Sequence, residues 1–145
     1  MGRNINDLPK LGIKTSVPYS VTLTTAGTYY CLCDPSTAPF TKQYFTPNVV
    51  TGEITYDFDY EMLLQFIGDT GITVSGACDV TFALILNGVP YLTSPLTFVS
   101  SAKTNSMGAN AVMSFTKGDV IQVMAKSDTD GIVLGVQSLH VSIGL

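Results

Sequence analysis

The feature that most constrains the fold is an alternation of apolar and polar residues between Glu53 and Phe66. An α-helix would scatter both kinds of residue around its circumference, whereas a β-strand places each kind on its own side. The segment therefore predicts one long strand whose apolar side covers a core. The apolar positions are Ile54, Tyr56, Phe58, Tyr60, Met62, Leu64 and Phe66, and the polar ones are Glu53, Thr55, Asp57, Asp59, Glu61 and Gln65.

The same two-residue period recurs along the rest of the chain, in residues 17–23, 78–86, 111–115, 121–125 and 139–143. Because these segments are short and no helical period interrupts them, we predict an all-β protein. The expected architecture is an antiparallel β-sandwich, a jelly roll of eight to ten strands.

Turn sequences separate the expected strands: Gly68–Gly71, Asn87-Gly88, Lys117–Asp119 and Asp128–Gly131. Pro90 and Pro95 follow the Asn87-Gly88 turn and lack amide donors, so their strand is expected at a sheet edge. Residues 35–47, with three prolines, and residues 100–110 are expected to be loops.

The chain is poor in charge. Charged residues make up 12% of it, about half of the usual ~25%. A surface this short of charge suggests cover by partner subunits, although a neutral surface of Ser, Thr and Asn is the alternative. The seven Lys and Arg form no cluster and no apolar run spans a bilayer, so neither nucleic acid nor membrane is an expected partner.

Three cysteines, Cys31, Cys33 and Cys78, leave one unpaired in any case. Cys31 and Cys33 lie two apart on one side of an expected strand, where a bridge between them would be strained. Reduced thiols in a cytoplasm are expected, and Met1–Leu11 lacks the apolar core of a signal peptide. A bridge from Cys78 and a zinc site that includes His140 are the alternatives, and we expect no cofactor.

No enzyme motif is present: the sequence lacks a P-loop, a dinucleotide fingerprint and a nucleophile elbow. A Ser-His-Asp triad would need His140, which is expected to face outward in the last strand. Asp57, Asp59 and Glu61 would lie ~7 Å apart along one side of their strand. We interpret them as a solvated face or a polar contact with another subunit. Calcium, helped by loop oxygens, and a glycosidase pair are further alternatives.

The second half resembles the C1q/tumour-necrosis-factor jelly roll. The resemblance covers residues 47–145 and rests on Asn87-Gly88, on Lys117-Gly118-Asp119 followed by Ile121 and Val123, and on "TGEITYDF" from Thr51. It implies a ten-strand sandwich that assembles as a homotrimer around a three-fold axis. Two departures leave the strand order open: the last strand lacks an aromatic residue, and residues 35–47 have no counterpart.

The short chain with its leading Met and its many Ser, Thr and Asn residues also looks like small virion proteins of tailed bacteriophages. The expected function is therefore a non-enzymatic head decoration or cementing protein of the virion, made in the host cytoplasm. The alternative is the receptor-binding tip of a tail fibre or another module that recognises glycans or cell surfaces.

Residues 1–18 are expected to form an extended arm ahead of a single domain at 19–145. Its apolar side chains cannot form a core alone, but they could bury themselves on the major capsid protein or another virion subunit. The predicted arm contacts are Ile5, Leu8, Leu11 and Ile13.

Overall fold

The computed structural model describes residues 8–15, 17–32, 40–48, 51–98 and 105–145, and this part of the chain forms twelve antiparallel strands in two sheets. Sheet A contains β1 (Lys10–Lys14), β2 (Tyr19–Leu23), β4 (Phe40–Gln43), β7 (Met62–Val74), β10 (Asn105–Phe115) and β12 (Ile132–Gly144). Sheet B contains β3 (Tyr30–Cys31), β5 (Phe45–Pro47), β6 (Ile54–Tyr56), β8 (Cys78–Leu86), β9 (Val89–Phe98) and β11 (Val120–Ser127). The all-β sandwich prediction is confirmed, with more strands than the eight to ten expected.

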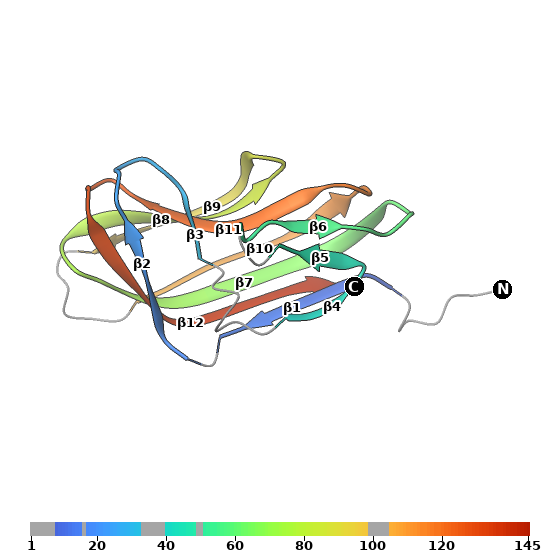
Figure 1. Cartoon of the computed structure of the whole chain (residues 1–145), viewed down its shortest axis with the longest axis horizontal. Helices are drawn as coiled ribbons and strands as arrows, with labels where there is room; N and C mark the ends of the chain where they lie inside the picture. The colour runs from blue at the N-terminus through green and yellow to red at the C-terminus, as the bar shows by residue number, and fades with distance from the viewer. Residues whose placement is uncertain (1–7, 16, 33–39, 49–50, 99–104) are drawn as a thin grey trace.

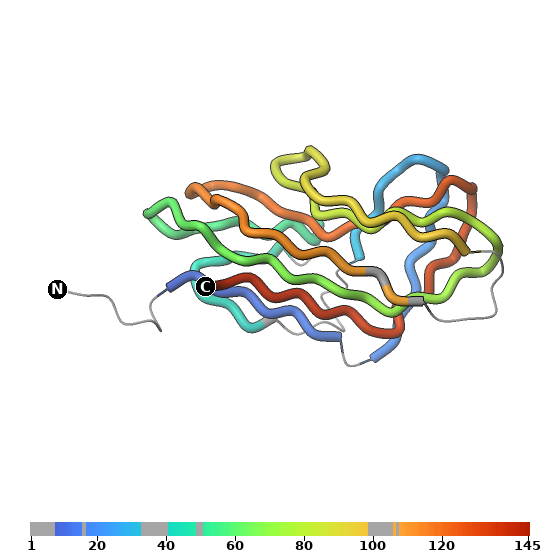
Figure 2. The backbone as a smooth tube through the Cα atoms, turned by 180° about the vertical axis from the view of Figure 1, so that it is seen from behind, coloured from blue at the N-terminus to red at the C-terminus, as the bar shows by residue number. Residues whose placement is uncertain are grey.

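The two sheets lie face to face (Figure 1). Sheet A has the order β10-β7-β12-β1-β4, with β2 paired to the other half of β12, and sheet B has the order β5-β6-β11-β8-β9, with β3 on β11. Figure 2 shows β10, β7, β12 and β1 side by side in orange, green, red and blue. The chain crosses between the sheets several times, which is typical of a jelly roll.

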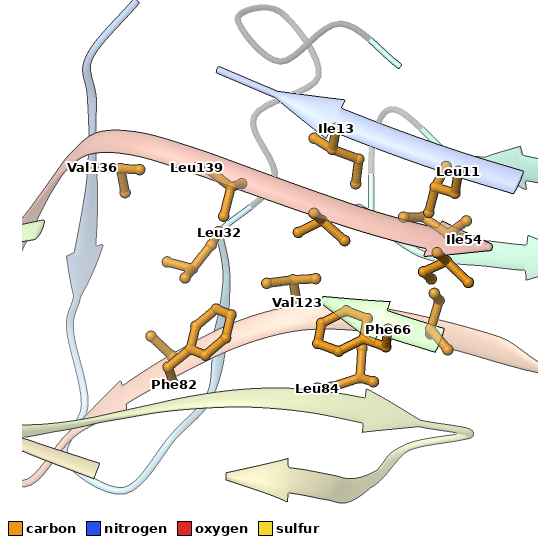
Figure 3. Packing of buried hydrophobic residues seen from close by; sticks show 14 of the residues in the cluster. Leu11, Ile13, Leu32, Ile54, Phe66, Phe82, Leu84, Val123, Val136 and Leu139 are labelled. Carbon is orange, nitrogen blue, oxygen red and sulfur yellow. The ribbon is translucent and has the colours of Figure 1, made fainter. Parts of the chain in front are cut away.

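The core fills the space between the sheets. Figure 3 shows Ile13 and Leu139 of sheet A pointing toward Phe82 and Leu84 of sheet B, and all four side chains are buried. Side chains that alternate along each strand thus meet their counterparts from the other sheet, as expected for packed sheets.

The predicted long strand from Glu53 to Phe66 is wrong. Its first part is β6 in sheet B, its last part belongs to β7 in sheet A, and residues 57–61 connect the two sheets. The alternation continues because this connection crosses the end of the core: the Phe58 ring lies 4.6 Å from Tyr44 and 6.4 Å from Tyr56 between ring centroids. Burial of a side chain, not strand geometry, maintains the pattern there.

The predicted turn Gly68–Gly71 is also wrong, because these residues continue β7. A Cβ atom at Gly68 would lie 2.8 Å from Cζ of Phe66, so glycine gives that ring room inside the sandwich. Thr70 is buried and donates a hydrogen bond to the Ser138 carbonyl at 2.7 Å. Gly68 and Thr70, which are residue types typical of turns, therefore have packing roles within a strand.

The prediction that residues 1–18 form an extended arm is wrong for the residues from Lys10 onward. Residues Lys10–Lys14 form β1, which pairs with β12 and β4, so the domain begins before residue 19. Leu11 and Ile13 are buried in the core of their own chain, because inward-facing positions of a central strand are covered by the opposite sheet. Ile5 lies outside the described residues, and Leu8 lies just before β1 and is half-buried.

The hairpin predictions are confirmed. Asn87 and Gly88 both have positive φ, at 50° and 81°, as a type I′ turn requires. The strand that follows, β9, lies at the edge of sheet B and contains Pro90 and Pro95. Two expected loops contain strands instead: β4 and β5 lie within residues 35–47, and β10 begins at Asn105.

Candidate functional site: the outer face of sheet A

The three acidic residues singled out by the sequence do not share one side of a strand. Asp57, Asp59 and Glu61 lie in the connection between β6 and β7, and this connection lies at one end of the sandwich (Figure 1). The face expected from strand spacing is therefore absent. Whether any of these residues contacts another subunit stays a prediction.

Each of these carboxylates is held by a different element. Because the partners belong to β5, to the turn after β10 and to β10 itself, the carboxylates do not converge on one point. The hydrogen bonds run from Thr46 Oγ1 to Asp57, from Lys117 Nζ to Asp59 at 2.6 Å and from Ser114 Oγ to Glu61 at 2.6 Å. No cluster of His, Cys, Asp and Glu suited to a metal ion occurs in the described part of the chain.

The zinc alternative fails on geometry for the ligands that the structure describes. His140 faces outward from β12 in sheet A, as predicted, whereas Cys31 and Cys78 belong to sheet B or its edge, in the other layer of the sandwich. Burial raises the pKa of the Cys78 thiol, so it stays protonated at neutral pH. Cys33 lies outside the described residues.

The residues that carry the family resemblance meet at one end of sheet B. Asn87 Nδ2 donates to Asp119 Oδ1 at 3.0 Å, and Asn87 Oδ1 accepts from the Val120 amide at 2.8 Å. Asp119 Oδ2 also accepts from the Thr116 amide at 2.9 Å. The Asn-Gly and Lys-Gly-Asp turns are therefore joined to each other, which indicates a structural role for both motifs.

A ridge of three large apolar side chains stands on the outer face of sheet A. Leu63 and Ile67 of β7 are 66% and 41% exposed, and Val112 of β10 is 64% exposed. Val112 pairs with Gln65, which lies between Leu63 and Ile67 on the same side of β7. We call Leu63, Ile67 and Val112 the ridge.

A hollow lies beside the ridge on the same face, over β12 and β1. Its volume is about 430 Å³, and its lining includes small residues of neighbouring strands as well as larger side chains near the two ends of the chain: Gly12, Thr41, Ser142 and Gly144, with Leu8, Pro9, Lys10 and Leu145. Ile67 of the ridge pairs with Ser142, which in turn pairs with Gly12, so ridge and hollow lie in consecutive positions across the sheet. Small side chains at these outward positions create the depression.

Charges are separated across this face. Lys10 and Lys14 are exposed on β1 beside the hollow, whereas Asp69 is exposed on β7 beside the ridge and Glu61 just precedes β7. His140 lies between the two sides, in register with Lys14 and Asp69. The basic side chains therefore lie on β1 and the acidic ones on or just before β7, with the outward residues of β12 between them.

Comparison with solved structures identifies the fold. The insect TNF Eiger from S. frugiperda aligns with a TM-score of 0.63 at 13% identity, covering 94% of this chain and 93% of that one. The globular domain of zebrafish complement 1qA aligns at 0.51 with 11% identity (94% and 96% covered). Murine APRIL aligns at 0.54 with 10% identity (94% and 98% covered).

The chain has a TNF/C1q-like jelly-roll fold. The resemblance stated from the turn motifs is confirmed at the level of the fold, and it extends over nearly the whole chain instead of residues 47–145 alone. No protein-family model matches the sequence, and no curated protein matches it significantly. No helix in the described part of the chain is long and apolar enough to span a membrane.

The ridge was not predicted, although the sequence contains a signal for it. Leu63 falls on the otherwise polar side of the alternation around β7, and Val112 lies between the inward-facing Ala111 and Met113. An apolar residue at an outward position of a strand marks exposed apolar surface. The hollow had no such signal, because it depends on which strands lie beside Gly12 and Gly144.

Proposed function

We propose that this chain is a non-enzymatic structural protein that assembles as a homotrimer through the outer face of sheet A. The observation that carries the proposal is the ridge: three large apolar side chains stand exposed on one sheet face, on the opposite side of sheet A from the buried core. Exposed apolar surface gathered on one face is typical of an interaction site. The jelly-roll fold and the low charge of the chain support a trimer.

A matched pair of substitutions tests this proposal. Val112 of sheet A and Val89 of sheet B are both 64% exposed, so Lys at either position should be tolerated by the fold. The Val112→Lys variant places a charge in the proposed interface, where burial without a partner is costly, and it should be monomeric. The Val89→Lys variant should keep the mass of the unmodified protein.

Multi-angle light scattering measures the outcome directly. We expect the unmodified chain and Val89→Lys to show close to three times the 15.4 kDa mass of the chain, and Val112→Lys to show that mass once. If the Val112→Lys variant were trimeric, the outer face of sheet A would not be the interface. A monomeric unmodified protein at tens of micromolar would overturn the proposed assembly.

The proposed setting of the trimer is the outside of a virion head, where it would decorate or cement the capsid shell. The low charge of the chain fits a surface covered by other subunits. Because β1 belongs to the domain, only the residues ahead of Lys10 remain available as the proposed tether to the shell. Ile5 is the predicted apolar contact of that tether, whereas Leu8 lines the hollow beside β1.

A short deletion tests the tether separately from the trimer. Removing residues 1–7 leaves β1 intact, so the variant should still be trimeric and should no longer co-sediment with shells of the major capsid protein from the same genome. A longer deletion that includes β1 would expose the core, so it cannot test the tether separately from the fold. Equal co-sedimentation of the deleted and full-length proteins would contradict the role of the tether.

A further inference from the structure

The turn between β8 and β9 contains a reactive pair of residues. Asn87 is the only asparagine in the sequence that is followed by glycine, and it is exposed. The backbone nitrogen of Gly88 can attack Cγ of Asn87, because glycine has no Cβ to hinder the approach. The new N–Cγ bond closes a succinimide ring and the side-chain nitrogen leaves as ammonia. Water then opens the ring to aspartate or isoaspartate, so the modification needs no other reactant.

The folded turn holds the Asn87 side chain away from this reaction. Its Nδ2 donates to Asp119 Oδ1 at 3.0 Å, and its Oδ1 accepts from the Val120 amide at 2.8 Å. The Asn87 amide donates in turn to the Val120 carbonyl at 2.7 Å. The side chain thus extends the ladder between β8 and β11 beyond its last pair, Leu86 with Ile121. Both side-chain bonds have to break before the Asn87 side chain is free to turn toward the Gly88 nitrogen.

The same contacts cannot accept the product. Asp119 uses Oδ1 to accept from Asn87 and Oδ2 to accept from the Thr116 amide at 2.9 Å. A carboxylate at position 87 would replace the donor to Oδ1 by a second negatively charged acceptor, and like charges at this distance repel. Isoaspartate would also add a backbone carbon to a turn whose geometry depends on positive φ at Asn87 and Gly88.

We infer that Asn87 is a site of spontaneous deamidation, which the closed turn suppresses and which weakens the joint between β8 and β11 once it has occurred. A transient opening of the turn thereby becomes a permanent change in sheet B. All the groups involved belong to one chain and lie in sheet B. The inference therefore does not depend on the proposed assembly through sheet A.

Peptide mass mapping of protein incubated at mildly alkaline pH tests the site and its protection. Asn87 should deamidate roughly tenfold or more slowly in the folded protein than in guanidinium chloride, because two hydrogen bonds must break first. Asp119→Ala removes the acceptor and should speed the reaction in the folded protein, whereas Lys117→Ala in the same turn keeps the acceptor and should not. Equal rates in folded and denatured protein would overturn the protection, and an unmodified Asn87 in denatured protein would overturn the site.

A charge swap tests the consequence. In the Val112→Lys background, Asn87→Asp should lower the thermal midpoint by roughly 5 °C, and high salt should reduce this loss by screening the repulsion. Adding Asp119→Asn should restore the midpoint, because the introduced amide can donate to the introduced carboxylate and still accept from Thr116. An unchanged midpoint in Asn87→Asp, or no recovery in the double variant, would overturn the proposed weakening of the joint.

Discussion

The two faces of sheet A are built from the same strands, and they differ in what covers their apolar residues. Along β7, Leu64 and Phe66 point inward and are buried, whereas Leu63 and Ile67 point outward and are exposed. The inner residues belong to the core between the two sheets, whereas the described part of the chain leaves the outer ones exposed. Apolar residues on the inner face therefore stabilise the fold, whereas those on the outer face are available for association.

The largest expected difference separates neighbouring residues of β7. Phe66→Ala should lower the free energy of unfolding by about 3–5 kcal/mol, because it removes a fully buried ring and leaves a cavity. Ile67→Ala should change it by no more than about 0.5 kcal/mol. Urea denaturation in the Val112→Lys background measures both without a contribution from assembly. Equal losses of stability in the two variants would contradict the distinction between the inner and outer faces of sheet A.

The buried Tyr56 and the exposed Tyr91 allow the same comparison for the pH dependence of stability. Burial, with a smaller effect of Asp119, raises the pKa of Tyr56 from 10.0 to about 12. The folded protein therefore keeps this proton after the unfolded chain has lost it, and stability falls as the pH rises from 10 to 12. The expected loss is about 2–3 kcal/mol, and the contribution is fully present below pH 10.

The matching measurement is urea denaturation at pH 9 and above in two variants. Tyr56→Phe removes the titrating group and should flatten the fall in stability over this pH range. Tyr91→Phe, at a position 48% exposed on β9, should leave the fall unchanged. Identical pH profiles for the two variants would contradict the assignment of the effect to burial.

Substitutions at two glycines test the same contrast between the faces, with smaller expected effects on stability. Gly68→Ala on the inner side of β7 should destabilise the protein by about 1–3 kcal/mol, because its Cβ would lie 2.8 Å from the Phe66 ring. Gly12→Ala on the outer side of β1 should be neutral or slightly stabilising, because alanine loses less backbone entropy than glycine. Thermal unfolding of both variants in the Val112→Lys background would show the difference, and a neutral Gly68→Ala would contradict it.

The smallest effect is expected from the surface ion pair at the end of the sandwich. Asp59 raises the pKa of Lys117 through a direct hydrogen bond, but both side chains are solvent-exposed. Exposed pairs contribute little to stability because water and salt screen them. Lys117→Ala should leave the urea midpoint unchanged within error, and a clear drop would show that the connection between the sheets depends on this contact.

Local patterns in the sequence predicted the fold class and the hairpins. The Asn87-Gly88 turn was predictable because positive φ at both positions strongly favours these two residue types. The edge position of β9 followed from two residues without amide donors. Both features depend on residues close together in the chain.

Features that depend on distant parts of the chain were not predictable in this way. Whether residues 57–61 continue a strand or cross between sheets depends on Phe58 contacting Tyr44 and Tyr56. The pairing of β1 with β12 joins opposite ends of the chain. Because no local pattern around Leu11 indicates this pairing, the sequence predicted an arm there. The hollow beside it likewise arises only when Gly12 and Gly144 become neighbours in the sheet.

The most direct test of the central claim is sedimentation equilibrium of the unmodified protein over a range of concentrations around tens of micromolar. The outer face of sheet A should associate, so we expect a mass close to three chains that dissociates toward one chain on dilution. A mass of one chain at every concentration would contradict the claim that this apolar face is covered by copies of the same protein.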